Sequence, residues 1–320
     1  MAKLLGKYTA RELLASDLVT SKPLIDGLLY EDDAVILVGR EKSNKSTLAM
    51  QMCVALSSGQ SLFNTFSIPR QVPSVYIQAE GKLSSTKSNL QNMLLARDCD
   101  PDNILFLYYP RIPLNQHDGL KRVIDDIDSW DRQPRLIIPD PLYHCMHGSL
   151  KDDERAREMT GNMRVLASRY QSAIMIVHHC HTVKRMPDGK IVDEGDNSIF
   201  GSFVWKAFPD SVFMIQKVQG NKNFRKFYCD TQRSGDIVTG LDLLLVEPSP
   251  YFLALRDESP IRKLIFAVLK PDIGITSQEL ADLIKRSRRH VSTELNEMFA
   301  ENMVSFSEIE KNKRLWVKKL

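Results

Sequence analysis

The sequence lacks three features that would place it in a special class of protein. No apolar run approaches the about 18 residues of a membrane-spanning helix, and the N-terminal region has no secretory apolar core or cleavage site. The five cysteines are widely spread without a C-x-x-C pair, which argues against a disulfide framework or a cysteine-rich zinc site. We therefore expect a cytoplasmic protein with reduced thiols and no membrane partner.

Neither sign of charge dominates the chain. The net charge of +3 is too small to identify a partner, so the places where lysine and arginine cluster must decide this question. A hydrophobic content of 43% with 26% charged residues is typical of a folded domain. The 320 residues suffice for one large domain and one small one.

From Asp33 onward, short apolar runs alternate with amphipathic helical patterns. The runs that we interpret as strands are 34–39, 74–80, 104–109, 135–140 and 173–179. This alternation predicts an α/β fold with a mostly parallel sheet and helices on both faces, and ligands bind such sheets at the carboxyl ends of the strands. Three later runs, at 211–218, 226–230 and 242–247, are separated by turn residues and predict hairpin-like additions at one edge.

The pattern changes near residues 247–260, where three prolines and several acidic residues precede a helix-rich tail. We place a domain boundary at about residue 257 on this change in composition. The predicted division is an N-terminal arm (1–25), a sheet-containing domain (26–257) and a small C-terminal domain (258–320).

The stretch GREKSNKST (39–47) resembles the phosphate-binding loop G-x-x-x-x-G-K-[ST]. It follows a predicted strand and precedes a helical pattern, as this motif requires. Lys45 has the spacing to reach the β- and γ-phosphates of ATP, and the Ser46 hydroxyl has the spacing to bind Mg²⁺. The other residues of the predicted ATP-binding segment are Gly39, Ser43, Asn44 and Thr47.

Asn44 stands where the motif has its second glycine. If this position needs a positive φ angle, asparagine is among the best substitutes for glycine. If it needs space beside the phosphates, Asn44 crowds the ligand, and Lys42 and Ser43 provide no glycine to relieve it. The third interpretation is that the match to the motif is due to chance. The residues at the ends of the other predicted strands distinguish this interpretation from a nucleotide site.

Two carboxylates follow predicted strands. Asp140 ends the run at 135–140, where an acidic residue can hold Mg²⁺ opposite the Ser46 hydroxyl. Glu80 ends the run at 74–80, on a strand that could lie beside the loop strand, where a carboxylate could orient or deprotonate the attacking water. Either acidic residue alone is weak support, because such residues are common after strands.

The order of these motifs is similar to that of the RepA-like (AAA_25-type) branch of RecA-fold ATPases, which includes plasmid hexameric replicative helicases, and more distantly to that of the DnaB helicases. The similarity covers residues 20–245 and includes "VYIQAEG", "LIIPDPL", "DDERAREMTGNMRVLASRY", "IMIVHH" and "GSFVWKAFPDSV". It implies a RecA-like P-loop NTPase core that binds ATP and Mg²⁺, assembles into a hexameric ring and acts on DNA. It implies Glu80 as the catalytic carboxylate, Asp140 as the Walker B acid, and His178 or His179 as the sensor of the nucleotide state.

The family also uses a K-x-R-x-G element that reaches the γ-phosphate of a neighbouring subunit. The segment "TQRSG" matches it with Arg233 at the finger position and Thr231 in place of the lysine. The resemblance implies that Arg233 stabilises the transition state in trans, and an exposed hairpin arginine is the alternative. Nearby basic residues are either contacts for single-stranded DNA or parts of a solvated hairpin: Lys217, Lys222, Arg225 and Lys226.

The polar segment 181–202 is punctuated by glycine and proline, which predicts a mobile loop over the site. In RecA-like helicases the equivalent region faces the central DNA channel. The resemblance therefore implies phosphate contacts from Lys184 and Arg185, with Lys190 as a further candidate.

Histidine and cysteine gather at 144–147 and 178–181, each time after a predicted strand. Zinc accepts such ligands, which opens a rival interpretation of the strand ends. The spacing matches no common zinc pattern, and the adjacent His178 and His179 must point to opposite faces of the sheet. Sensor or packing roles are therefore favoured.

The tail resembles a winged helix-turn-helix, because its pattern runs helix, short strand, helix, helix and two strands. Residues 259–320 contain 12 Lys and Arg against 8 Asp and Glu, a local balance of +4. Basic residues at the start of the second paired helix and in the wing are predicted to contact duplex DNA, namely Arg286, Arg288, Arg289 and Arg314. The alternative is a domain that contacts only protein. Ser277 and Ser287 are the predicted helix N-caps.

Together these patterns predict an ATP-hydrolysing RecA-fold motor, resembling a replicative helicase of a plasmid, phage or other mobile element. The alternative is a nucleotide-gated DNA-binding or loader protein with weak or absent turnover. Asn44 and Thr231 favour this alternative, whereas Glu80 and Asp140 oppose it. A DNA-binding regulator with a RecA-like scaffold would be insensitive to Lys45→Ala.

Overall fold

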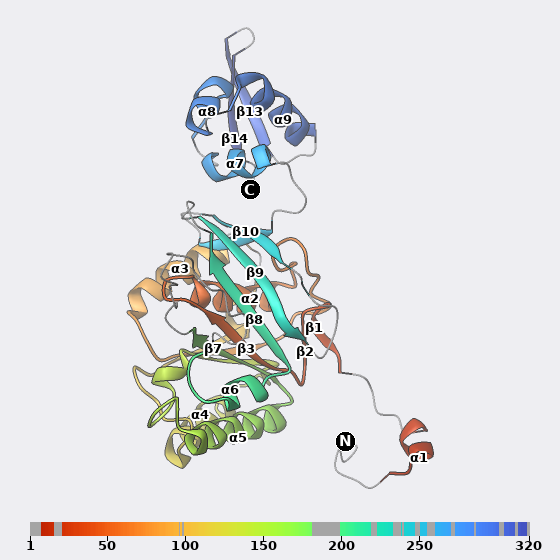
Figure 1. Cartoon of the computed structure of the whole chain (residues 1–320), viewed down its shortest axis with the longest axis vertical. Coiled ribbons are helices and arrows are strands. Elements are labelled where there is room, and N and C mark those ends of the chain that lie inside the picture. The colour runs from red at the N-terminus through yellow and green to blue at the C-terminus, as the bar shows by residue number, and fades with distance from the viewer. Residues whose placement is uncertain are drawn as a thin grey trace, which may run out of the picture.

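The structure is a computed structural model, and a nine-stranded sheet forms its centre (Figure 1). It describes residues 8–15, 21–95, 97, 99–180, 199–218, 223–232, 238, 240–246, 250–254, 260–269, 273–284, 286–300, 304–310 and 313–318. The strand order across the sheet is β11-β10-β9-β8-β3-β7-β6-β4-β5. These strands are β3 (Ala34–Gly39), β4 (Ser74–Gln78), β5 (Ile104–Tyr108), β6 (Leu136–Asp140), β7 (Ala173–His179), β8 (Ser211–Lys217), β9 (Phe224–Gln232), β10 (Leu241–Val246) and β11 (Tyr251–Ala254).

The sheet has a parallel part and an antiparallel part. Strands β5, β4, β6, β7, β3 and β8 pair in parallel, whereas β8, β9, β10 and β11 pair antiparallel. A parallel strand that is covered on both faces needs a continuous apolar sequence, and the runs in β3, β6 and β7 have this character. The predicted α/β fold with hairpin additions at one edge is confirmed.

Helices cover both faces of the parallel part, and alternate residues of each strand point to opposite cores. In β3, Val35 and Leu37 pack in the core that contains α2, whereas Ile36 and Val38 pack in the core that contains α4 and α5. The four covering helices are α2 (Lys45–Ser58), α3 (Leu83–Leu95), α4 (His117–Asp128) and α5 (Asp153–Tyr170). Asp152 caps α5 by accepting hydrogen bonds from the backbone N–H groups of Glu154 and Arg155.

Shorter elements complete this part of the chain: α1 (Ala10–Leu14), β1 (Pro23–Ile25), β2 (Leu29–Tyr30), the 3₁₀ turns η1 (Pro101–Asn103) and η2 (Leu142–His144), and α6 (Val204–Ala207). Strands β1 and β2 form a separate two-stranded antiparallel sheet. In the part of the chain that the structure describes, no helix has the length and apolar character needed to cross a membrane.

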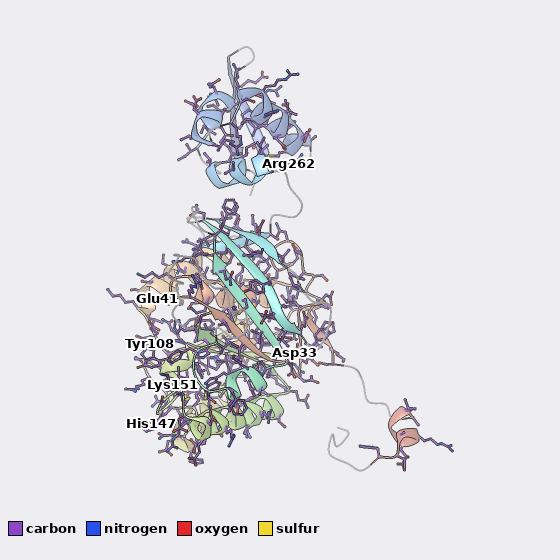
Figure 2. All side chains as sticks on the ribbon, in the orientation of Figure 1. Asp33, Glu41, Tyr108, His147, Lys151 and Arg262 are labelled. Carbon is purple, nitrogen blue, oxygen red and sulfur yellow. The ribbon has the colours of Figure 1, made fainter. Side chains whose placement is uncertain are left out.

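The two ends of the parallel strands lie at opposite sides of the molecule (Figure 2). Glu41 and Tyr108, at or just beyond the carboxyl ends of β3 and β5, lie on one side, and Asp33, just before β3, lies on the other. The prediction that the strand before Glu80 lies beside the loop strand is wrong, because β7 and β6 lie between β3 and β4. The apolar pattern specifies that β4 is buried on both faces but does not specify its neighbours.

The C-terminal elements form a small unit with its own three-stranded antiparallel sheet, in the order β12-β14-β13. In chain order the unit contains α7 (Pro260–Val268), β12 (Ile275–Thr276), α8 (Ser277–Ile284), α9 (Arg288–Ala300), β13 (Val304–Glu310) and β14 (Lys313–Lys318). Its buried residues include Ile265, Leu280, Val291 and Trp316. The order of elements is the predicted one, while the boundary at residue 257 and the winged-helix assignment stay predictions.

One of the two predicted helix caps in this unit is wrong. Thr276, not Ser277, caps α8: its hydroxyl accepts from the Glu279 N–H at 3.3 Å, and the Glu279 carboxylate accepts from the Thr276 N–H at 2.9 Å. This reciprocal pair is a capping box, and it starts the helix one residue earlier than the serine alone suggests. Ser287 caps α9 as predicted, with its hydroxyl 3.4 Å from the His290 backbone nitrogen.

Candidate nucleotide-binding site

A pocket of about 520 Å³ opens at the carboxyl ends of β3, β4, β6 and β7. It is lined by most of the residues predicted to bind or hydrolyse ATP, namely Asn44, Lys45, Ser46, Thr47, Glu80, Asp140 and His179. Two residues of the predicted ATP-binding segment, both among the described residues, are not on its wall. The carbonyl oxygen of Gly39 accepts a hydrogen bond from the Lys45 ammonium, and Ser43 is fully buried.

The phosphate loop has a backbone that few residue types tolerate. A Cβ atom on Gly39 would lie 2.5 Å from the carbonyl oxygen of Ile215 and 2.6 Å from the Ser43 hydroxyl, so only glycine fits there. Lys42 and Asn44 have positive φ angles of 60° and 70°, in the left-handed region. Asn44 therefore replaces glycine at a position that needs a positive φ angle, which agrees with the first interpretation of this position.

The Asn44 side chain points to β9 and binds an arginine there. Its Oδ1 atom accepts hydrogen bonds from the Arg225 guanidinium, with a distance of 3.2 Å to Nε and a second bond to Nη2. Arg225 is only 5% exposed, so the expectation that it contacts DNA or belongs to a solvated hairpin is wrong. Because residues alternate along a strand, Arg225 lies on the same face of β9 as the buried Phe227 and Cys229.

Lys45 lines the pocket but is only 6% exposed, and its ammonium donates to the carbonyl oxygens of Gly39 at 2.9 Å and Arg40 at 3.0 Å. Burial lowers the pKa of Lys45, while the negative charge of Asp140 acts in the opposite direction. The Nδ1 atom of His179 is 3.3 Å from the ammonium nitrogen. Burial and this neighbouring positive charge both lower the pKa of His179, which favours the neutral imidazole.

The two adjacent histidines take opposite directions, as predicted. His179 lines the pocket, whereas His178 is fully buried, with Nε2 2.7 Å from the Phe200 carbonyl oxygen and its ring beside Trp205. Of the two candidates for a nucleotide sensor, His179 is therefore the residue with access to a ligand.

Asp140 and Ser46 form the corner of the pocket that suits a magnesium ion. Carboxylate and hydroxyl oxygens are the hard ligands that Mg²⁺ prefers. Asp140 is 5% exposed, and burial raises the pKa of its carboxyl group, whereas hydrogen bonds from Tyr76 and Ser46 and the nearby Lys45 act to lower it. The Tyr76 hydroxyl donates to Oδ2 of Asp140. Tyr76 was not among the predicted site residues, although a buried tyrosine needs a partner for its hydroxyl.

Glu80 stands at the mouth of the pocket, in a turn that neighbouring side chains hold. The Gln78 amide donates to the Glu80 carbonyl at 2.7 Å, and the Tyr108 hydroxyl donates to the Gly81 carbonyl at 3.3 Å. The Glu80 side chain is 59% exposed, and its carboxylate is 3.8 Å from Nε2 of His144. A carboxylate in this position is open to water and faces the same cavity as Lys45 and Asp140.

The rival zinc interpretation finds no assembled ligand set. Across the ranges that the structure describes, no group of three or more His, Cys, Asp or Glu side chains is placed to hold a metal ion. Cys145 is fully buried, which raises the pKa of its thiol. His181, which belongs to the second cluster, lies outside the described residues.

Some of the residues predicted to contact DNA or a neighbouring subunit lie within the described part of the chain and others lie outside it. Arg233, Lys184 and Arg185 lie outside the described residues. At the start of α9 the predicted residues Arg286, Arg288 and Arg289 are exposed. Arg314 instead packs within its own unit: its guanidinium lies 4.0 Å from the centre of the Phe306 ring and donates to Asn296 at 3.2 Å.

Comparison with known families agrees with this geometry. Residues 7–183, more than half of the chain, match the model of the AAA domain family AAA_25. The chain belongs to this family. No curated protein matches the sequence.

Among solved structures, one described as an ATPase domain superposes with a TM-score of 0.52 at 12% identity, covering 71% of this AAA domain chain and 86% of that one. A DnaB-like replicative helicase, described with its primase interactions, gives 0.49 at 12% identity, covering 71% and 58%. The RadB recombinase gives 0.45 at 14% identity, covering 68% and 89%. The chain has the RecA-like P-loop NTPase fold, which confirms this part of the predicted fold class, while the winged-helix part stays a prediction.

Proposed function

We propose that this AAA domain protein binds and hydrolyses ATP with Mg²⁺ as a RecA-fold motor on DNA, and that it is a replicative-helicase-like protein of a plasmid, phage or other mobile element. The observation that carries the proposal is the convergence in one pocket of Lys45, Ser46, Glu80, Asp140 and His179, which come from the ends of four strands. A pocket of about 520 Å³ is within the range of small-molecule sites.

The residues present fit the magnesium complex of ATP. The first turn of α2 offers backbone N–H groups for phosphate oxygens, and no hydrogen bond from the Asn44 side chain caps this turn. Lys45 supplies a positive charge beside the same turn. Ser46 and Asp140 would hold Mg²⁺, which neutralises developing charge on the phosphates when bound. Glu80 would orient the attacking water and accept its proton.

Assembly and DNA binding are further parts of the proposal. The family resemblance supports a hexameric ring in which Arg233 reaches the nucleotide of a neighbouring subunit. It also supports a channel in which single-stranded DNA contacts Lys184 and Arg185. The exposed arginines at the start of α9 support duplex binding by a C-terminal winged helix.

The decisive experiment measures ATP hydrolysis by the purified protein with and without single-stranded DNA. Glu80→Gln is the test variant, and Glu41→Gln is the matched control, because Glu41 lines the same pocket with an 81% exposed side chain. We expect DNA-stimulated hydrolysis that Glu80→Gln abolishes and Glu41→Gln leaves intact.

Two other outcomes would change the proposal. ATP binding without hydrolysis, with or without DNA, would replace the motor by the nucleotide-gated loader. Calorimetry of Lys45→Ala provides the second check, since this variant removes the ammonium beside the phosphate-binding turn. An unchanged ATP affinity would contradict both functions and leave a RecA-like scaffold.

A further inference from the structure

Asn44 occupies the N-cap position of α2 but does not cap the helix. Asparagine is among the preferred N-cap residues because its side-chain oxygen accepts a hydrogen bond from the second or third N–H of the helix. Here the backbone at Asn44 is left-handed, with φ 70° and ψ 34°, and the side chain makes no capping hydrogen bond. Its oxygen is instead bound to Arg225.

Arg225 is placed behind the phosphate loop by strand alternation and held there by backbone acceptors. Its Nε atom is 3.2 Å from the Ser43 carbonyl oxygen as well as from Oδ1 of Asn44, and Nη1 donates to the Phe224 carbonyl at 2.7 Å. Burial lowers the pKa of Arg225, but a guanidinium stays protonated and keeps its donors in a fixed planar fork. The Asn44 carboxamide therefore has a permanent donor on the side away from the pocket.

We propose that Arg225 is a positioning residue that holds the Asn44 carboxamide away from the N-terminus of α2, so that the N–H groups of this turn stay open to the phosphates of a nucleotide. The inference rests on the proposed nucleotide-binding function. A free asparagine side chain at an N-cap competes for the same N–H groups that an anion needs. Arg225 removes this competition without touching the nucleotide.

The test is a double-mutant cycle on residues 44 and 225, read by the affinity for a fluorescent ATP analogue with Mg²⁺ and by urea denaturation. The variants are Arg225→Gln, Asn44→Gly and the double variant. Arg97→Gln is the matched control, because burial also lowers the pKa of Arg97 and its side chain does not line the pocket. Arg225→Lys, which keeps the buried charge, serves if Arg225→Gln does not fold.

We expect Arg225→Gln to weaken nucleotide binding about tenfold, the effect of losing one hydrogen bond to a charged group. Adding Arg225→Gln to Asn44→Gly should change the affinity by no more than about twofold, because glycine adopts the same φ angle and has no carboxamide to compete. Arg225→Lys should give an intermediate loss in the wild-type background and little further loss beside Asn44→Gly. Arg97→Gln should leave the affinity unchanged.

Equal losses of affinity from the Arg225 substitution in both backgrounds would overturn the proposal. So would a result in which Arg225→Gln lowers the denaturation midpoint but leaves nucleotide affinity at the wild-type value, since the arginine would then be structural only. Failure of the proposed function looks different, because the wild-type protein itself would not bind the analogue, and that outcome would overturn both conclusions.

Discussion

Replacing Tyr76 by phenylalanine removes one hydroxyl from the corner of the pocket that we propose binds magnesium, and leaves the ring in place. Tyr76 is 2% exposed, and its hydroxyl donates to Oδ2 of Asp140, which is 5% exposed. Asp140 lines the pocket but exposes little of its surface, so water replaces the lost donor only in part. A hydrogen bond to a charged group contributes about 1.5–3 kcal/mol, and we expect Tyr76→Phe to lower the free energy of unfolding by about this amount at neutral pH.

The loss should depend on pH, with a sign fixed by Asp140. Burial raises the folded-state pKa of Asp140 above its value in the unfolded chain, and the bond from Tyr76 acts to lower it. Protonation of Asp140 thus stabilises the fold in acid, and this contribution is lost as the pH rises through the folded-state pKa. Tyr76→Phe raises that pKa further. Its cost is therefore largest when the carboxylate is ionised and becomes smaller in acid.

Urea denaturation at neutral pH and at about pH 4, near the pKa of an unperturbed aspartate, measures both effects. Tyr170→Phe is the matched control: its hydroxyl donates to Oδ1 of Asp128 at 2.8 Å, but the Asp128 side chain is 41% exposed. Water can replace that donor, so we expect a clearly smaller loss. Equal losses for the two variants, or a loss for Tyr76→Phe that does not change with pH, would refute the electrostatic account of this corner.

Four other changes give separate checks. Gly39→Ala places a Cβ atom 2.5 Å from the Ile215 carbonyl oxygen and should lower the free energy of unfolding by about 1–3 kcal/mol in urea denaturation; a neutral effect would contradict the loop geometry. Asp140→Asn removes a charge whose burial raises the pKa of the carboxyl group, so the ligand-free protein should become more stable at neutral pH while magnesium-dependent hydrolysis is lost; a less stable variant would argue against this. Arg233→Ala should lower hydrolysis by the assembled protein and spare ATP binding, whereas activity that is independent of protein concentration and of this change would exclude a finger in trans. Replacing Arg288 and Arg289 together by glutamine should reduce the salt dependence of DNA binding by a slope of about 0.9 for each phosphate that the protein no longer neutralises, and an unchanged slope would place DNA elsewhere.

The parallel sheet and its antiparallel edge could be predicted because burial constrains sequence directly. A strand covered on both faces must be apolar throughout, and the runs from β3 to β7 have this composition. The position of β4 in the sheet could not be predicted in the same way. Its sequence requires burial but is compatible with several neighbouring strands. The connection from β3 to β4 leaves a gap of two strands in the sheet, and β6 and β7, which come later in the chain, occupy it.

The predicted pocket residues converge because each follows a parallel strand, and such strands end at one edge of the sheet. Arg225 and Tyr76 were missed because both act through another residue. The burial of Arg225 could have been predicted, because every second residue after it in its strand, including the apolar Phe227 and Cys229, lies on the same face of the sheet. The surrounding lysines suggested a solvated hairpin instead. The charge composition indicates only that the hairpin as a whole is polar. The alternation of side chains along the strand determines on which face of the sheet each residue lies.

The contact between Asn44 and Arg225 constrains how related sequences can vary. Losing the arginine alone frees a carboxamide at the helix N-terminus, and losing the asparagine alone removes an acceptor from a buried guanidinium. We therefore expect the two positions to covary: homologues with asparagine in the loop keep arginine on the neighbouring strand, and those with glycine in the loop accept other residues there. A motif search that demands the second glycine would overlook such proteins, whereas a search for the pair would recover them.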